Sequence, residues 1–309
     1  MFFEALKAFI IGLVEGLTEW LPISSTGHMI LVDEFVKLDV SNAFLEFFLV
    51  VIQIGAILAV IILYFTKLNP FSSKKSAEER KGTWRLWGMV VIGCIPAAVI
   101  GILFDDWVTE HMHNAWVVAA MLILYGVIFI VLELRNRRRY TQYVHDSYAH
   151  PEKPVALNSE GEPDPDAMFA IRTVDEIDWK CAIKIGLFQC LAIIPGTSRS
   201  GATIIGGMLT GCSRTAAAEF TFFLAIPIMF GWGLVKAFKT FFSAGLIMTA
   251  TEGVVLVVGL VTAFVVSVIS IKFLMGYIKN NDFAPFGIYR IVVGVVVLGY
   301  FGLKAAGLF

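Results

Sequence analysis

The sequence predicts an all-α, polytopic membrane bundle with six spanning helices and two re-entrant helical hairpins, built as an inverted-topology repeat. Its 309 residues are 58% hydrophobic and 16% charged, with a mean hydropathy of +0.78, whereas a soluble domain carries about 25% charge. Six apolar runs are long enough to cross about 30 Å of hydrocarbon. Two further apolar segments are each broken by a proline and small polar residues. These observations exclude a cytosolic enzyme and a disordered scaffold.

The charge balance and the cysteines exclude other classes. With 24 basic and 25 acidic residues the net charge is −1, so no global basic field attracts nucleic acid. The N-terminus lacks a basic leader and a small-residue cleavage site, which is unlike a signal peptide. Neither a disulfide framework nor a zinc site is indicated, because the cysteines are scattered without CxxC spacing: Cys94, Cys181, Cys190 and Cys212.

The predicted spans follow from uncharged runs in chain order. They cover residues 47–66, 86–104, 115–132, 220–235, 253–271 and 283–303. Arg290 lies near one end of the last span, where its head either snorkels to the interface or serves a site.

Two segments do not fit the spanning class. Residues 5–31 are interrupted by LPISSTGH at 21–28, and residues 182–212 by IPGTSRSG at 194–201. Non-helical backbone at membrane depth is tolerated only where protein or a wet cavity satisfies its polar groups. Broken helices at corresponding places in two halves are typical of a midplane site. We therefore expect two re-entrant hairpins whose tips share a cavity.

The two halves correspond as an internal repeat. Adding 173 to a position in the first half gives its counterpart, pairing Pro22 with Pro195, Gly27 with Ser200 and Glu46 with Glu219. Each half contains one hairpin and three crossings, and an odd number of crossings inverts the second half. The predicted organisation is a first repeat at 1–135, a hydrophilic cytoplasmic linker at 136–180 and a second repeat at 181–309. The linker is either a solvated tether or a regulatory segment.

Loop charges orient the bundle. Basic clusters follow the first and third spans, whereas Asp105, Asp106 and Glu110 lie between the second and third. By the positive-inside rule the basic loops are cytoplasmic. Both termini are then outside, and the first hairpin enters from the outer face and the second from the inner face.

Glu15 and Glu19 stand four residues apart before the first break, so both carboxylates project from one helix face. Two like charges on an apolar helix predict a cation between them. Mg²⁺ or Ca²⁺ is the preferred candidate, since hard cations take oxygen ligands. The alternative is two glutamates that face water at the outer mouth.

The first break supplies Ser24, Ser25, Thr26, Gly27 and His28. A helix that begins here presents free N–H groups to an anion, and the glycine lets backbone approach a ligand. An ordinary capping turn with a structural histidine is the alternative.

The second break adds a guanidinium, Arg199, between Ser198 and Ser200. Arginine binds phosphate through a planar fork, and the alternative is a structural salt bridge. Acids, a histidine, hydroxyls and an arginine at two facing hairpin tips are what phosphoryl transfer requires. Because the site lies within the bilayer, a lipid phosphate is the natural substrate.

At these residues the sequence resembles the undecaprenyl-pyrophosphate phosphatase family of the bacitracin-resistance type. The resemblance is carried by VEGLTEWLPISSTGHMI at 14–30, PGTSRSGATI at 195–204, FFLVVIQIGAILAV at 47–60 and GIYR at 287–290. It covers nearly the whole chain. Trp20, where phenylalanine is commoner, and the hydrophilic insert near 140–175 depart from the family pattern.

The resemblance implies metal-assisted hydrolysis of undecaprenyl pyrophosphate to undecaprenyl phosphate and inorganic phosphate, which recycles the carrier for cell-wall synthesis. By this likeness Glu15 and Glu19 serve the metal, and Arg199 clamps phosphate oxygens. Ser25 is the favoured nucleophile with His28 as its base, and a phosphohistidine is the alternative. The implied substrate-binding residues are Ser24, Thr26, Gly27, Gln53, Ser198, Ser200 and Thr203.

A transporter or lipid flippase is the competing function, because inverted repeats with broken helices are transporter architecture. The expected location is the bacterial cytoplasmic (inner) membrane, with the site open to the outer (periplasmic) face. The expected partners are a polyprenyl pyrophosphate substrate and membrane lipids, with no nucleic acid. The oligomeric state, including a homodimer, is left open.

Overall fold

A computed structural model describes residues 1–149, 156–157, 161, 163–238 and 248–307. Within these residues the regular elements are all helical, and the only β-type contacts are two isolated bridges. The helices are α1 (Phe2–Thr18), α2 (Ser25–Phe35), α3 (Asn42–Leu63), α4 (Phe65–Leu68), α5 (Ala77–Met112), α6 (Ala115–Ala149), η1 (Pro165–Met168), η2 (Val174–Glu176), α7 (Trp179–Cys190), η3 (Leu191–Ile193), α8 (Arg199–Leu209), α9 (Arg214–Phe238), α10 (Ala250–Tyr277) and α11 (Ala284–Ala305).

The six predicted spans are confirmed among the described residues. The helices long and apolar enough to cross a membrane are α3, α5, α6, α9, α10 and α11, so the chain is a multi-pass membrane protein. Two of these helices extend beyond the uncharged runs from which their spans were predicted. A capping box between Ser76 and Glu79 begins α5 well before residue 86, and α6 continues through an arginine-rich stretch to Ala149. Charged residues with long side chains are good helix formers, so a helix need not end where its hydrophobicity ends. The expected linker therefore begins in helix, and its residues 150–155, 158–160 and 162 lie outside the described residues.

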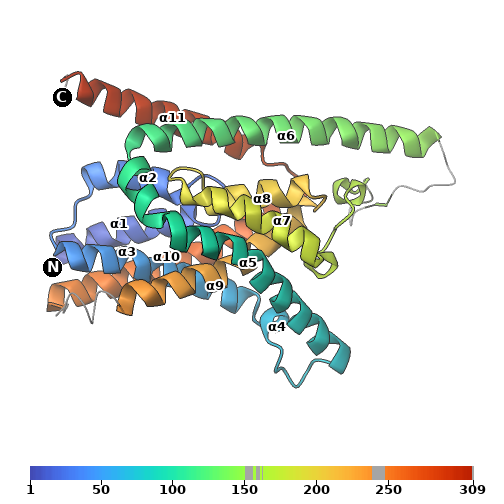
Figure 1. Ribbon diagram of the computed structural model, residues 1–309, viewed down its shortest axis with the longest axis horizontal. Helices are drawn as coiled ribbons and strands as arrows, with labels where there is room; N and C mark the ends of the chain where they lie inside the picture. The colour runs from blue at the N-terminus through green and yellow to red at the C-terminus, as the bar shows by residue number, and fades with distance from the viewer. Residues whose placement is uncertain (150–155, 158–160, 162, 239–247, 308–309) are drawn as a thin grey trace.

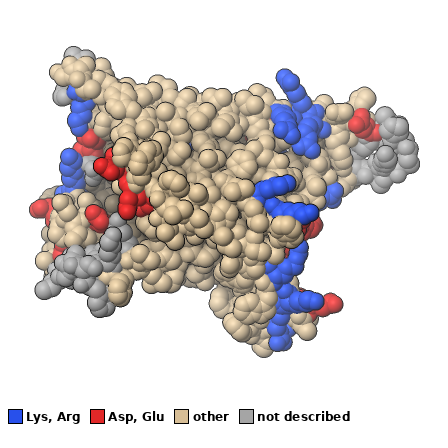
Figure 2. All heavy atoms as spheres, in the orientation of Figure 1, with Lys and Arg blue, Asp and Glu red and all other residues tan. Residues whose placement is uncertain are grey.

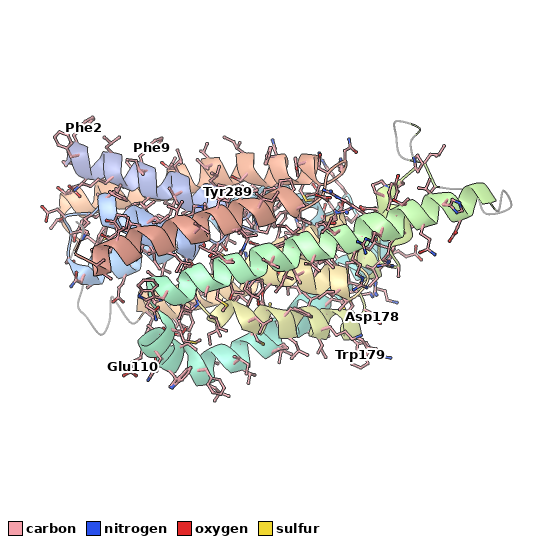
Figure 3. All side chains as sticks on the ribbon, turned by 90° about the horizontal axis from the view of Figure 1, so that it is seen from above. Phe2, Phe9, Glu110, Asp178, Trp179 and Tyr289 are labelled. Atoms are coloured by element: carbon pink, nitrogen blue, oxygen red, sulfur yellow. The ribbon has the colours of Figure 1, made fainter. Side chains whose placement is uncertain are left out.

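The helices lie along one long axis, with both chain termini at the same end (Figure 1). The start of α1 lies at that end, and the start of α7 lies at the other. Figure 3 shows the same separation, with Phe2 and Glu110 at one end and Asp178 and Trp179 at the opposite end. On the face drawn in Figure 2, most Lys and Arg side chains gather at the end where α7 begins. The two broken segments thus approach the middle of the bundle from opposite ends.

The two breaks have the same local geometry. Ser24 caps α2 and Ser198 caps α8, and both have left-handed backbone, with φ of 73° and 71°. Their hydroxyls accept hydrogen bonds from Gly27 N at 3.3 Å and Gly201 N at 3.1 Å. The spacing between the caps is therefore 174 rather than the 173 that pairs Gly27 with Ser200. At that spacing Gly196, with φ of 90°, stands in the second break where Pro22 stands in the first.

Glycine contacts fix how each broken segment packs. A Cβ on Gly12 of α1 would lie 2.6 Å from Gly259 O of α10, and a Cβ on Gly186 of α7 would overlap Gly93 O of α5. Small residues let membrane helices approach closely, because helix association within lipid depends on packing. The helix that leads into each break is thereby pressed against one long spanning helix, α10 for α1 and α5 for α7.

Candidate active site

Glu19 joins the two broken segments. This residue ends α1, and its carboxylate accepts a hydrogen bond from Ser25 Oγ at Oε2 (2.9 Å) and from Arg199 Nη2 at Oε1 (3.0 Å). The Arg199 and Glu19 side chains are only 12% and 10% exposed, so solvent screens the pair weakly. Residues 180 positions apart in the chain therefore meet at one carboxylate.

Arg199 is the first residue of α8 and is held from two sides. Besides Glu19, its guanidinium donates from Nη1 to Thr221 O on α9 at 3.1 Å, and it lies over the Trp20 ring at 5.9 Å. Its Nε has no acceptor within the described residues. The structural salt bridge expected as an alternative is present, and the Nε–H is among the N–H groups that remain unused.

The predicted hydroxyl residues of the second break connect the two segments. Ser200 Oγ lies 3.1 Å from Glu19 O and 3.3 Å from Leu21 O, both of which can accept its proton. Thr203 Oγ1 donates to Arg199 O at 2.9 Å, and Thr221 Oγ1 donates to Thr203 Oγ1 at 2.8 Å. Ser200 and Thr203 thus fix the backbone around Glu19 and Arg199.

His28 lies on α2 and uses both ring nitrogens within the protein. Nδ1 is 2.7 Å from Ser24 O, which only accepts, so Nδ1 carries the proton. In the neutral ring Nε2 then accepts from the hydroxyl of Tyr289 at 2.8 Å. The two rings stack at 5.5 Å with planes 5° apart, and Figure 3 places Tyr289 near the middle of the bundle. Within the described residues no hydrogen bond joins His28 to Ser25.

Sequence reasoning missed Tyr289 as a partner of His28. The GIYR motif at 287–290 was the available signal, but the contact spans 261 positions and depends on how α11 packs. No local pattern reports such a contact.

Glu15 lies one turn before Glu19 and is buried, at 3% exposed. Its Oε1 has no hydrogen-bond partner in the described part of the chain. The amide oxygen and nitrogen of Gln189, 174 positions later, have none there either. Carboxylate and amide oxygens are ligands that Mg²⁺ and Ca²⁺ accept, so the donor chemistry at Glu15 fits such an ion. No three His, Cys, Asp or Glu side chains form a metal-binding group among the described residues.

A cavity of about 570 Å³ lies over Glu19 and Arg199. Its polar wall comes from both breaks and α3: Glu19, Ser25, Thr26, Gln53, Ser198 and Arg199. Its apolar wall comes largely from α5 and α9 and includes Ala97, Gly101, Ile102, Met229, Trp232 and Val235. The other predicted site residues do not line it: Glu15, Ser24, Gly27, His28, Ser200 and Thr203. The cavity therefore brings together six of the twelve predicted site residues, and the predicted base, His28, is not one of them.

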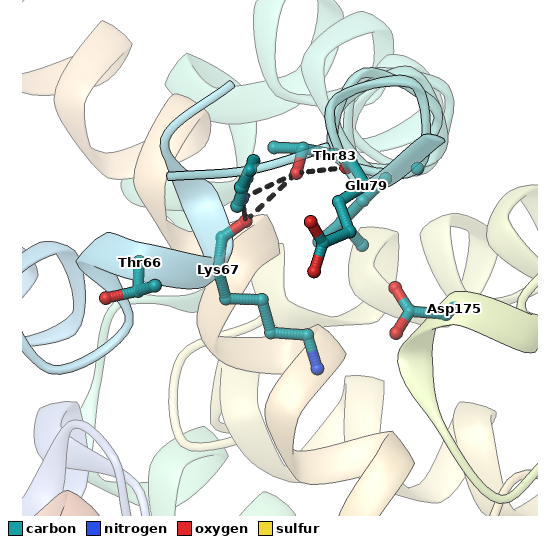
Figure 4. A pocket seen from close by; sticks show the side chains of 8 residues that line it. Thr66, Lys67, Glu79, Thr83 and Asp175 are labelled. Atoms are coloured by element: carbon teal, nitrogen blue, oxygen red, sulfur yellow. Dashed lines mark hydrogen bonds between the residues drawn. The ribbon is translucent and has the colours of Figure 1, made fainter. Parts of the chain in front are cut away.

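A second pocket, of about 490 Å³, lies near the junction of α4, α5 and η2 (Figure 4). Lys75 Nζ donates there to Lys67 O at 2.9 Å and to Thr83 Oγ1 at 2.7 Å, and Lys67 Nζ pairs with Glu219 at 2.9 Å. None of the predicted site residues lines this pocket. The ion pair between Lys67 and Glu219 therefore offers a control for the pair between Arg199 and Glu19.

Comparison with known proteins decides the family. A family model described as bacitracin resistance protein BacA matches residues 8–296. The chain belongs to the BacA family. Among its BacA relatives, the undecaprenyl-diphosphatase of Enterococcus faecalis is 50% identical over 300 residues, which are 97% of this chain and 98% of that protein. Undecaprenyl-diphosphatase 1 of Clostridioides difficile is 52% identical over 301 residues, 97% of each chain. The undecaprenyl-diphosphatase of Latilactobacillus sakei is 50% identical over 296 residues, 96% of this chain and 97% of that protein.

Proposed function

We propose that this protein is an integral membrane phosphatase that hydrolyses undecaprenyl pyrophosphate to undecaprenyl phosphate and inorganic phosphate. One observation carries the proposal: a single carboxylate, Glu19, holds a hydroxyl nucleophile and a phosphate-binding guanidinium at the polar wall of a cavity whose other wall is apolar. The family and the names of relatives that are about 50% identical over nearly the whole chain point to the same activity. The reaction returns undecaprenyl phosphate as the carrier for cell-wall synthesis, and the description of the family names resistance to bacitracin.

Ser25 is the nucleophile in this proposal. Its Oγ attacks the terminal phosphorus, the bond from that phosphorus to the bridging oxygen breaks, and undecaprenyl phosphate leaves. The Ser25 proton passes to Glu19, which is already its hydrogen-bond acceptor at 2.9 Å. Water then attacks the phosphoserine, releases inorganic phosphate and restores the Ser25 hydroxyl. Glu19 is better placed than His28 to act as the base, because His28 is committed to Ser24 and Tyr289.

Charge on the transferred phosphoryl group is stabilised from two directions. Arg199 exchanges part of its bonding to Glu19 for phosphate oxygens, using the fork geometry suited to phosphate. The N-termini of α2 and α8 both begin at the cavity, where their free N–H groups favour an anion. We propose that Glu15 and Glu19 hold a divalent cation, Mg²⁺ or Ca²⁺. When bound, such an ion would neutralise charge on the phosphate oxygens.

The shape of the cavity suits a lipid substrate. A volume of about 570 Å³ holds a pyrophosphate headgroup and the first part of a chain, while α5 and α9 supply an apolar wall for that chain. The remaining tail lies in the bilayer, where large apolar side chains such as Ile102 and Trp232 are exposed on the protein surface, at 82% and 45%. An amphiphilic substrate thus keeps its charge on the polar wall and its tail in lipid.

The membrane arrangement is part of the proposal. We propose that α1–α2 and α7–α8 are re-entrant hairpins of an inverted repeat in the bacterial inner membrane. The matching caps, the glycine contacts on α10 and α5, and the opposite starts of α1 and α7 support it. Basic residues gather at the end where α7 begins (Figure 2), which makes that end cytoplasmic by the positive-inside rule. The site then opens toward the periplasm, since Asp105 and Val235, near the other ends of α5 and α9, line the cavity.

The decisive experiment measures phosphate release and maps the intermediate. Purified protein in liposomes containing undecaprenyl pyrophosphate should release inorganic phosphate, and rapid acid quenching should trap phosphate on Ser25. An acid-labile phosphate on His28 would instead assign the nucleophile to the histidine. Lipid movement between leaflets, scored in the same liposomes without phosphate release, would support a flippase and contradict the phosphatase.

A further inference from the structure

Arg290 is a buried cation between the two breaks. It lies on α11 and is 0% exposed. Its Nη1 donates to Pro22 O at 3.1 Å, and its Nη2 donates to Gly196 O and Thr197 O at 2.9 Å each. No carboxylate pairs with it within the described residues. Burying an ion is destabilising unless good hydrogen bonds compensate, and here the compensation comes from backbone carbonyls of both broken segments.

The carbonyls that Arg290 binds lie beside strained backbone. Pro22 lies two residues before Ser24, and Thr197 directly precedes Ser198. Both serines have positive φ, at 73° and 71°, with ψ of 100° and 121°. A non-glycine residue in such a region is strained and persists only where its surroundings enforce it. Arg290 is one such restraint, because it binds the carbonyl of the peptide that leads into Ser198 and a carbonyl one peptide earlier in the first break.

The bond to Thr197 O also sets the direction of a donor. In a trans peptide the carbonyl and the next N–H point to opposite sides. Because the Thr197 carbonyl points at Arg290, the N–H of Ser198 points away from Arg290. Ser198 lines the cavity, and its N–H has no acceptor in the described part of the chain. This N–H is therefore free to bind a phosphate oxygen, and Arg290 determines where it points.

The start of α8 is shaped around the same guanidinium. A Cβ on Gly201 would lie 3.2 Å from Arg290 Nη1, so any larger residue there would crowd it. The guanidinium also donates weakly to Met121 O on α6, at 3.4 Å. Arg290 is thus enclosed by both breaks and α6, and it does not line the cavity.

From these contacts we infer that Arg290 is a positioning residue. It holds both breaks in the strained conformation that aims the Ser198 N–H and the start of α2 at the substrate phosphate. The inference deepens the proposed phosphatase function and rests on it for its kinetic consequence. Its structural consequence, a link between the two hairpin tips, can be tested without any reaction.

The test compares Arg290→Lys and Arg290→Gln with Arg214→Lys. Arg214 is a matched control, because it is also buried, at 6% exposed. It forms an ion pair with Glu133 at 2.6 Å, lies outside the cavity and contacts neither break.

Lysine at 290 keeps the charge but cannot reach three carbonyls at once, and glutamine loses the charge as well. Both variants should lower kcat on undecaprenyl pyrophosphate by about 100-fold, the effect of losing one aimed donor. The KM should change less than about threefold, since Arg290 does not line the cavity, and Arg214→Lys should leave both constants near wild type.

Hydrogen exchange measured by mass spectrometry gives the reading that does not depend on activity. In the Arg290 variants, exchange should rise in peptides covering 19–28 and 194–203 together and stay unchanged in α3 and α9. In Arg214→Lys it should stay unchanged in both breaks. A rise throughout the chain, a rise in one break alone, or full kcat in Arg290→Lys would overturn the positioning role. If the wild-type protein released no phosphate, the phosphatase proposal would fail, and the exchange comparison would still decide whether Arg290 links the breaks. If Arg290→Gln does not fold, Arg290→Lys alone decides both readings.

Discussion

Replacing Glu19 by glutamine tests the centre of the proposed site. The amide keeps the size of the side chain but has one acceptor and one donor group. Arg199 offers only donors, so the amide oxygen of the variant must face Arg199 and its NH₂ group must face Ser25. Ser25 then accepts a hydrogen bond where the wild type has it donate one at 2.9 Å, and the nucleophile loses its base.

The expected magnitude follows from that reversal. A positioned general base contributes about 10²–10⁴-fold, and the pair with Arg199 is only about one-tenth exposed on either side, so water cannot readily replace the carboxylate. We expect Glu19→Gln to lower kcat by about 10³-fold, which is roughly 4 kcal/mol of barrier. The measurement is phosphate release from undecaprenyl pyrophosphate in detergent, together with the amount of trapped phosphoenzyme.

Glu219→Gln is the matched control. Glu219 is also a partly buried carboxylate paired with a cation, Lys67, at 2.9 Å, but it lies beside the second pocket. This variant should keep kcat within about threefold of wild type, because a partly exposed ion pair is typically worth no more than about 1 kcal/mol. If Glu19→Gln retained wild-type turnover, Glu19 would not be the base. Equal losses in both variants would indicate a general effect of removing buried charge.

Three further expectations can be measured on the same preparations. Tyr289→Phe keeps the ring stacked on His28 but removes one hydrogen bond, worth about 1 kcal/mol, so kcat should fall less than about tenfold; a larger loss would place His28 in the chemistry. Gly186→Ala should lower the melting temperature sharply because its Cβ would overlap Gly93 O, whereas Gly88→Ala, with open space around it, should not. A chelator should abolish phosphate release and added Mg²⁺ or Ca²⁺ should restore it; activity that persists in chelator would remove the metal from the mechanism.

The spans could be predicted from sequence because membrane crossing depends on a local property, the length of an apolar run. The ends of the helices were harder to predict, since α6 continues through arginines to Ala149 and α5 begins at the Ser76 cap. The prolines and small polar residues located both breaks. The spacing of 174 between Ser24 and Ser198 was missed because the prolines of the two breaks, Pro22 and Pro195, align at 173, and only backbone conformation identifies which serines cap the helices.

The content of the site was more predictable than its connections. Glu19, Ser25 and Arg199 stood out because ionisable and hydroxyl groups are expensive within a membrane. Their arrangement around one carboxylate was not predictable, and the expected pairing of Ser25 with His28 is replaced in the structure by a bond to Glu19. Arg290 could be noticed in the sequence, but its acceptors are carbonyls of residues 94 and 268 positions away. Such contacts depend on packing between helices, which no local pattern encodes.

The residues at the two breaks give a reason why the proposed repeat would contain one site. Ser25 and Arg199 occupy the same position, directly after the capping serine of each break, and both bind Glu19. Glu15 and Gln189 stand 174 positions apart, so the second half carries an amide where the first carries a carboxylate. In the proposed mechanism the first half therefore supplies the base and the nucleophile, and the second supplies the guanidinium. If the proposed roles hold, a phosphoryl group is bound by both halves but attacked only from the first, so the proposed repeat contains one reaction centre.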